Sequence, residues 1–181
     1  MTEKVFYLNK KKLIFILTCG ILIILLGIFI LLEFFGTNWE LLLFHIIPIN
    51  RTVLGIGLIA FFSILSIPLI KKIKDDRPGL IINKQGIIDN SSYTSVGDVN
   101  WKEIIDSEIR TISGQKMILL KVKNAQIILD GFPSGMRKKI IESSSKINGT
   151  PVVIAASSLK GSFEEIYDAI KLGIDTNKSR I

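Results

Sequence analysis

Cysteine and histidine are almost absent from this sequence. Cys19 and His45 are the only examples among 181 residues, and both lie in the apolar first half. A single cysteine excludes an intramolecular disulfide, so the fold does not depend on an oxidising compartment. Cys19 is most simply read as a small buried thiol in a helix. A lone histidine in an apolar stretch is more typical of an interfacial residue than of a ligand.

The chain after Asp75 lacks both residue types entirely. This excludes Ser-His-Asp and Cys-His nucleophilic arrangements and leaves only carboxylates for a metal. No P-loop is present, and Gly55-Ile56-Gly57 falls inside an apolar run rather than a nucleotide-binding turn. We therefore expect no catalytic, cofactor-binding or metal site and no enzyme. A membrane enzyme that uses carboxylates stays as a minor alternative.

Charge is missing from two long segments, residues 13–32 and 53–70. Twenty helical residues span about 30 Å, the thickness of the hydrocarbon core, and eighteen are near the lower limit. We predict that both segments are transmembrane helices. Small residues should let them pack as a hairpin: these are Gly20, Gly27, Gly55, Gly57, Ala60 and Ser63. A cleaved signal peptide and a lipoprotein site at Cys19 are weaker alternatives, because the first run is too long and the flanking residues fit poorly.

The net charge of +7 is concentrated beside these segments. Residues 78–181 contain 14 basic and 11 acidic side chains, a net charge of only +3. Six lysines flank the apolar runs and are candidates for contact with lipid headgroups: Lys10, Lys11, Lys12, Lys71, Lys72 and Lys74. By the positive-inside rule both ends are cytoplasmic and residues 33–52 form an outer loop. The expected partners are the anionic inner leaflet and a protein, and nucleic acid is not expected, because the excess charge is not on the folded domain.

Residues 78–181 have the composition of a soluble domain, and we expect them to fold alone from about Asp76. Short strands are predicted at 80–82, 86–89, within 99–112, at 117–122, 126–129 and 151–156. A helix should run from Pro133 to about Ile147, with Met136, Ile140 and Ile141 facing inward. A second should begin after an N-cap at Ser162, with Glu165 completing the capping box, and bury Phe163, Ile166, Ile170 and Ile174. Trp101 should be the main aromatic of the core.

Two further charged groups have structural explanations. Asp75-Asp76 balances nearby lysines, and the acidic residues at 164, 165 and 168 suit a helix N-terminus. Residues 137–139 are three consecutive basic residues near a predicted helix start. They are read as a solvated face, and a phosphate or headgroup contact is the alternative.

Several motifs resemble one family. They are Arg-Pro-Gly-Leu-Ile-Ile-Asn at 77–83, Gly-Ile-Ile-Asp-Asn-Ser-Ser at 86–92, Trp101 followed by Ile104, and Ser-Leu-Lys-Gly-Ser-Phe-Glu-Glu-Ile at 158–166. With the lysine-flanked apolar pair, they are similar to small membrane-anchored bacterial proteins with a pleckstrin-homology-like domain, a family of largely uncharacterised function. The resemblance implies a strongly bent antiparallel sheet closed by a helix, although two helices are predicted here. It implies nothing specific about a ligand.

The expected class is α+β, in six parts: a basic cytoplasmic arm (1–12), two transmembrane helices (13–32 and 53–70) around an outer loop (33–52), a basic linker (71–77) and a cytoplasmic domain (78–181). Such a chain would be a multi-pass membrane protein with both termini in the cytoplasm. The leading hypothesis is a membrane-tethered binding or scaffolding module without catalysis. The alternative is an accessory or immunity-type protein that acts through the hairpin and its apolar outer loop.

Overall fold

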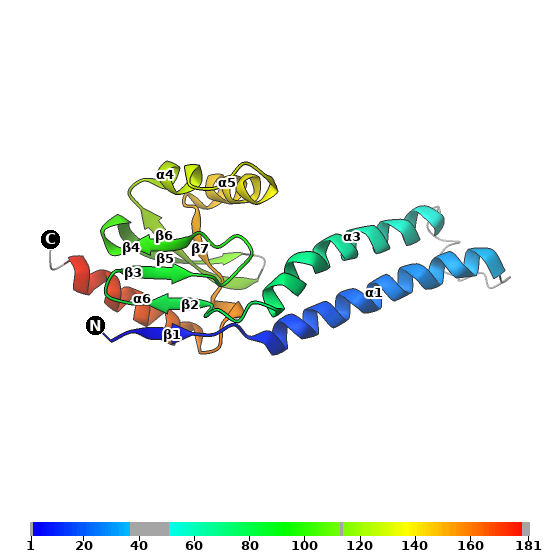
Figure 1. Ribbon diagram of the computed structural model, residues 1–181, viewed down its shortest axis with the longest axis horizontal. Helices are drawn as coiled ribbons and strands as arrows, with labels where there is room; N and C mark the ends of the chain where they lie inside the picture. The colour runs from blue at the N-terminus through cyan, green and yellow to red at the C-terminus, as the bar shows by residue number, and fades with distance from the viewer. Residues whose placement is uncertain (1, 37–50, 113, 179–181) are drawn as a thin grey trace. The chain divides into compact units, whose positions relative to one another are not determined.

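The computed structural model describes residues 2–36, 51–112 and 114–178. It divides the chain into two compact units (Figure 1). One is the helical hairpin, Lys10–Asp75, and the other, here called the α+β domain, combines Met1–Asn9 with Asp76–Ile181. The sequence predicts residues 1–12 as a separate basic arm. The structure instead places the first nine residues with the domain, because they contribute a strand to it.

Two long helices form the hairpin: α1 (Lys10–Gly36) and α3 (Arg51–Ile73). The stretches Lys10–Leu32 and Thr52–Ile73 are long and apolar enough to cross a membrane, and only 11% of each span is buried. A core helix of a soluble protein would be mostly buried, so the exposed apolar surface suits a membrane location. Pro68 lies inside α3, which continues to Ile73 before ending ahead of the Arg77-Pro78-Gly79 breaker.

The two helices are in close contact at Gly27 and Gly55. A Cβ on Gly27 would lie 3.0 Å from the carbonyl oxygen of Gly55, and Gly20 faces Ser66. These pairings run in opposite directions along the chain, so α1 and α3 are antiparallel. Packing through small residues is thus confirmed, but the small positions at 57, 60 and 63 are exposed rather than interfacial. The interfacial set on α3 follows the helical spacing 55, 59, 62 and 66 instead.

Gly55 should be far less tolerant of a large side chain than Gly57. A Cβ on Gly55 would meet Leu31 at 2.8 Å, whereas Gly57 has nothing within 4 Å. We expect Gly55→Leu to strain the helix pair by about 1–3 kcal/mol, as overpacking does elsewhere. The readout is disulfide formation between Gly20→Cys and Ser66→Cys in a Cys19→Ser background. The yield should drop with Gly55→Leu and hold with Gly57→Leu; equal yields in the two variants would contradict the packing described here.

The first sheet of the α+β domain has the order β1-β2-β3-β4, with every pair antiparallel. Its strands are β1 (Lys4–Phe6), β2 (Leu80–Ile82), β3 (Gly86–Asp89) and β4 (Gly97–Asn100). The chain leaves this sheet after β1, forms the whole hairpin and returns as β2. Beyond β1, residues 7–9 continue along the segment at 158–160: the Asn9 amide donates to Ser158 and the Lys160 amide to Tyr7. Residues 4–6 are therefore held by β2, and residues 7–9 are held by the segment at 158–160.

The second sheet has the order β5-β6-β7 and is also antiparallel. A short helical turn, η1 (Trp101–Glu103), leads into β5 (Ile104–Ile112), which pairs with β6 (Gln115–Val122); β7 (Val152–Ile154) lies on the other side of β6. The strand predicted at 126–129 is wrong, because these residues belong to helix α4 (Ala125–Asp130). Both edges of β6 are already paired, so no position beside it remained for that segment.

The main core lies between the sheets and the last helix, α6 (Phe163–Lys178). Phe6 and Leu8 belong to it, together with Trp101 and alternate residues of the central strands. The expected N-cap is confirmed, since the Ser162 hydroxyl accepts from the Glu165 amide at 3.0 Å. As predicted, Ile166, Ile170 and Ile174 are buried; Phe163 is half-buried and stacks on Tyr167. A second 3-10 turn, η2 (Ala156–Ser158), links β7 to this region.

Helix α5 (Met136–Asn148) follows α4, and Figure 1 shows both at the end of the domain away from β1 and α6. Of the three residues predicted to face inward, only Ile141 is buried. Met136 is 75% exposed and Ile140 is 42% exposed, so this part of the prediction is wrong. The buried side of α5 is set by Ile141, and Met136 and Ile140 lie about 100° or more away from it around the helix.

Candidate functional site

The six flanking lysines gather at one end of the hairpin. Lys10, Lys11 and Lys12 form the first turn of α1, and Lys71 and Lys72 lie in the last turn of α3, with Lys74 just beyond. Because the helices are antiparallel, the start of α1 and the end of α3 are at the same end. The structure thus brings together the six lysines predicted to contact lipid headgroups. We call these six residues the basic collar.

Helix stability explains only half of the basic collar. Cations near the C-terminus of α3 interact favourably with the helix dipole, but three lysines at the N-terminus of α1 oppose it. Lys72 also pairs with Asp75 at 3.8 Å, which agrees with the interpretation of Asp75 as local charge balance. The side chains of Lys11, Lys71 and Lys74 are exposed. An anionic surface outside the protein would offset the unfavourable interaction of the three lysines at the start of α1 with the helix dipole.

Both connections to the hairpin leave the first sheet at one corner. Phe6 ends β1, Leu80 begins β2, and the two are directly paired. The Gly79 amide also donates to the Phe6 carbonyl at 2.9 Å. Gly79 packs tightly against the Leu159 side chain, because a Cβ added at position 79 would overlap it. The chain therefore enters and leaves the hairpin from neighbouring points of a single folded sheet.

Sequence reasoning missed β1, although a signal was present. Residues 4–8 read Lys-Val-Phe-Tyr-Leu, and Phe6 and Leu8 alternate with more exposed neighbours. Such alternation of β-prone residues is typical of a half-buried strand. The segment was read as a charged arm because lysines surround it. Its pairing partner lies more than seventy residues away in sequence, so local pattern alone could not reveal the pairing.

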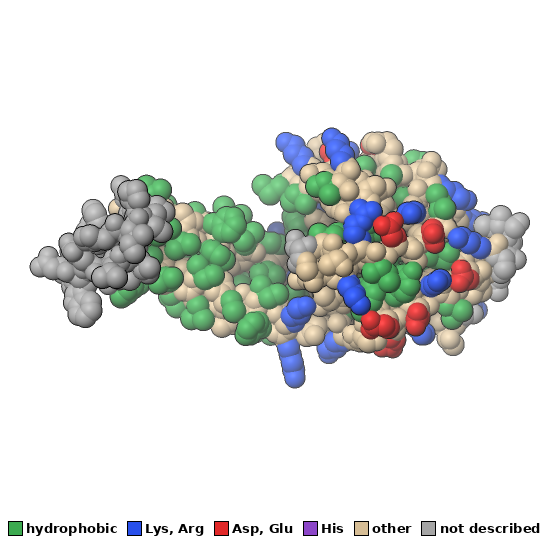
Figure 2. Space-filling view, turned by 180° about the vertical axis from the view of Figure 1, so that it is seen from behind, with side chains coloured by type: hydrophobic (Ala, Val, Ile, Leu, Met, Phe, Trp, Pro, Cys, Tyr) green, Lys and Arg blue, Asp and Glu red, His purple; other side chains and the backbone are tan. Residues whose placement is uncertain are grey.

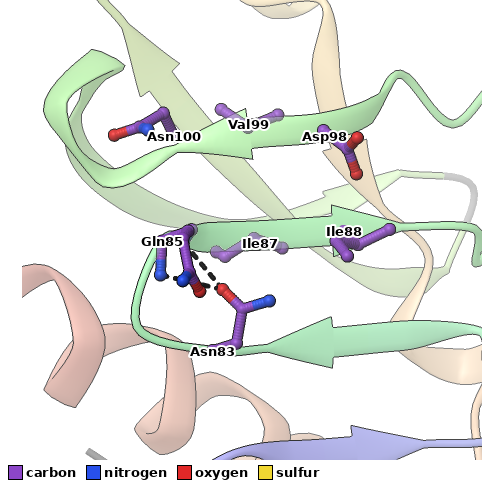
Figure 3. Close-up of a pocket in the computed structure, with 8 residues that line it drawn as sticks. Asn83, Gln85, Ile87, Ile88, Asp98, Val99 and Asn100 are labelled. Carbon is purple, nitrogen blue, oxygen red and sulfur yellow. Dashed lines mark hydrogen bonds between the residues drawn. The ribbon is translucent and has the colours of Figure 1, made fainter.

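A shallow depression of about 260 Å³ lies on β3 and β4 (Figure 3). Its polar lining is mostly occupied in forming turns. The Asn83 side-chain oxygen accepts from the amides of Gln85 and Gly86, at 2.9 and 3.0 Å, and Asn100 accepts from Lys102. Asp98 is the single carboxylate in the lining. With one acid and no partner base among its lining residues, the depression offers no acid–base pair for catalysis.

The other charged clusters among the described residues have structural roles. Among described residues no group of three or more potential metal ligands comes together. Arg110 donates to Glu108 at 3.1 Å and Lys121 pairs with it at 3.2 Å, and these contacts hold the pKa of the exposed Glu108 carboxyl below its usual value. The acidic residues Glu164 and Glu165 lie in the first turn of α6, as expected.

The basic run at 137–139 divides between two roles. Arg137 donates to the Ser95 carbonyl at 2.7 Å and lies over the Phe132 ring, so it anchors α5. Lys138 pairs with Asp130 of α4 at 3.8 Å. Lys139 is exposed. The run is therefore not a uniform solvated face.

Comparisons with known proteins found no matching family model, curated protein or solved structure. Residues 37–50 of the predicted outer loop, including Trp39 and His45, lie outside the described residues, and they contain the apolar stretch on which the accessory-protein alternative depends. That alternative stays a prediction.

Cys19 is exposed on α1 rather than buried in the hairpin.

Proposed function

We propose that this chain is a membrane-tethered binding or scaffolding module, without catalysis, that displays a pleckstrin-homology-like domain at the inner face of a membrane. One observation carries the proposal. The two strands that flank the hairpin in sequence, β1 and β2, pair with each other in the first sheet. A domain built in this way is tied to the membrane helices through two adjacent connections, as a displayed module would need.

The strand order supports the pleckstrin-homology-like part of the proposal. Four antiparallel strands are followed by three more, and a C-terminal helix packs into the core between them. Antiparallel strands and closure by a helix are among the features that the family resemblance implies. The departure is the insertion of α4 and α5 between β6 and β7, which places a second helical layer on the domain.

Strand pairing also supports a topology with both ends on one side. Residues 4–6 and 80–82 exchange backbone hydrogen bonds, and they can do so only in the same compartment. If α1 and α3 each cross the bilayer, the domain then lies wholly on one side. The basic collar favours the cytoplasmic side, where each lysine near the anionic leaflet contributes on the order of 1 kcal/mol.

Topology reporters test this orientation. A reporter active only outside the cytoplasm should be silent when fused after Ile181 and active when inserted near Asn38. Replacing the six lysines of the basic collar with glutamine should produce a mixed population, because the inside attraction is lost. An active fusion after Ile181 would contradict the proposal. Unchanged orientation after glutamine replacement would leave the topology standing but remove the collar as its cause.

Partner capture tests the binding role. Photo-crosslinking in native membranes, read by mass spectrometry, should recover a discrete protein from the full chain. A chain reduced to the hairpin should not recover it. If the hairpin alone captures the same protein, the membrane helices and not the domain carry the function.

A further inference from the structure

An unusual surface runs along α5. Met136 and Ile147 are 75% and 76% exposed, the highest values among the large hydrophobic side chains described in the α+β domain, and Ile140 is 42% exposed. They follow the helical spacing i, i+4 and i+11, so they form one stripe on α5. Ser143 lies within the stripe. Together with Ile112 these residues line an open groove of about 470 Å³.

Two lysines border the stripe on one side. Lys139 and Lys146 are seven residues apart, which puts them on a common edge of α5, and both are exposed. Figure 2 shows hydrophobic and basic side chains next to each other at the end of the domain where α4 and α5 lie. Within α5 itself the basic residues number four and the only acid is Glu142. Apolar side chains beside cations are the composition of a helix that lies in an anionic membrane interface.

We propose that the α5 stripe (Met136, Ile140, Ser143 and Ile147, with Lys139 and Lys146) docks on the surface of an anionic lipid bilayer. The inference rests on the proposed function, since it requires that α1 and α3 span the membrane. The apolar side chains enter the boundary between headgroups and acyl chains, and the lysines remain at the phosphates. Arg137 and Lys138 do not take part directly. Their contacts to Ser95 and Asp130 hold α5 on the domain.

Short tethers hold the α+β domain close to the membrane helices along the chain. Only residues 74–79 separate α3 from β2, and only residues 7–9 separate β1 from α1. Six residues extend at most about 20 Å, less than the length of a membrane-spanning helix. The domain is thus held close to the membrane surface, and docking requires that α5, which lies away from β1, turns toward that surface.

Charge argues against a second copy of the chain as the occupant. In a two-fold symmetric contact the same patch is used on both subunits. Lys139 and Lys146 of one copy would then face the same lysines of the other, which repel. Anionic lipid headgroups instead complement both lysines at once.

Spin labels on the full chain in lipid nanodiscs test the proposal. In a Cys19→Ser background, a label at Ser143→Cys reports the stripe, and one at Leu22→Cys, exposed at mid-α1, reports the hairpin. Collisions with oxygen and with a water-soluble nickel chelate measure lipid depth. We expect the Ser143 label to enter lipid when phosphatidylglycerol is present and to return to water in pure phosphatidylcholine. The Leu22 label should be in lipid in both.

Charge-removing variants sharpen the test. Lys139→Gln with Lys146→Gln should weaken docking roughly twenty-five-fold, because each lysine near an anionic surface is worth about fivefold. Lys84→Gln with Lys102→Gln, two exposed lysines elsewhere on the domain, should leave docking unchanged.

Three outcomes would overturn the proposal. If the Ser143 label stays in water with phosphatidylglycerol while the Leu22 label is in lipid, the stripe does not dock and the proposed function stands. If the Ser143 label is shielded from both collision reagents whatever the lipid charge, protein covers the stripe instead. If the Leu22 label is in water, the hairpin does not span, and the proposed function fails together with this inference.

Discussion

A fragment comprising residues 76–181 should fail to fold cooperatively, whereas the same fragment joined to residues 2–9 should fold. The second protein would carry residues 2–9, a flexible Gly/Ser linker in place of the hairpin, and then residues 76–181. The fragment alone loses β1 and leaves the sites of Phe6 and Leu8 empty, which are 6% and 3% exposed in the structure. Emptying two such sites costs about 5–10 kcal/mol, comparable with the whole stability of a typical domain.

Thermal melts followed by far-ultraviolet circular dichroism and by Trp101 fluorescence provide the measurement. Trp101 is the only tryptophan in either protein. A linked protein with Phe6→Asp and Leu8→Asp is the matched control and should behave like the fragment alone. If residues 76–181 melt cooperatively at the temperature of the linked protein, β1 is dispensable. The expectation from sequence, that the chain from Asp76 folds alone, would then be right.

Trp101→Ala should be the most damaging single substitution in the α+β domain. The indole is 5% exposed in the main core, and its Nε1 donates to the Asn83 carbonyl at 2.9 Å. We expect a loss of about 3–5 kcal/mol from the cavity. A further cost of about 1–3 kcal/mol applies if the Asn83 carbonyl stays unsatisfied. Chemical denaturation of the linked protein measures the change in unfolding free energy.

Trp101→Phe separates the two contributions, because it keeps most of the ring and removes the N–H donor. It should cost clearly less than Trp101→Ala. Ile105→Ala, a neighbouring exposed position, serves as a control with little expected effect. A loss below about 1 kcal/mol for Trp101→Ala would mean that the indole does not anchor this core.

Local signals in the sequence predicted the elements that depend on local chemistry. Charge-free length predicted α1 and α3, the Ser162 hydroxyl predicted the start of α6, and the spacing of Ile166, Ile170 and Ile174 predicted its buried face. The predicted strands at 80–82 and 86–89 leave three residues between them, and this spacing predicted the turn between β2 and β3. In each case the determining contacts lie within a few residues, so a single sequence carries the information.

The errors concern elements whose state depends on distant partners. Residues 126–129 are short and apolar, and such a run suits a strand or a helix equally. Its state was decided by β7, which occupies the edge of β6. Met136 and Ile140 were placed inward because apolar residues usually are, and their exposure reflects a surface that the domain does not cover itself. The same distinction holds for the candidate functional surfaces. The distribution of charge along the sequence predicted the basic collar, but it did not predict the α5 stripe.

The central claim is that β1 and β2 pair across the hairpin, so that both of its ends enter one sheet. Engineered disulfides in the full chain, oxidised in native membranes, test it directly. In a Cys19→Ser background, Val5→Cys with Ile81→Cys joins directly paired residues of β1 and β2. Ile81→Cys with Ile88→Cys joins β2 to β3 and is the positive control, independent of β1. Val5→Cys with Ile88→Cys is two strands apart, about 10 Å, beyond the reach of a disulfide.

We expect the first pair to form a disulfide as efficiently as the positive control and the third pair to form none. The first pair failing while the positive control succeeds would contradict the pairing of β1 with β2, and with it the argument that places both hairpin ends on one side of the membrane.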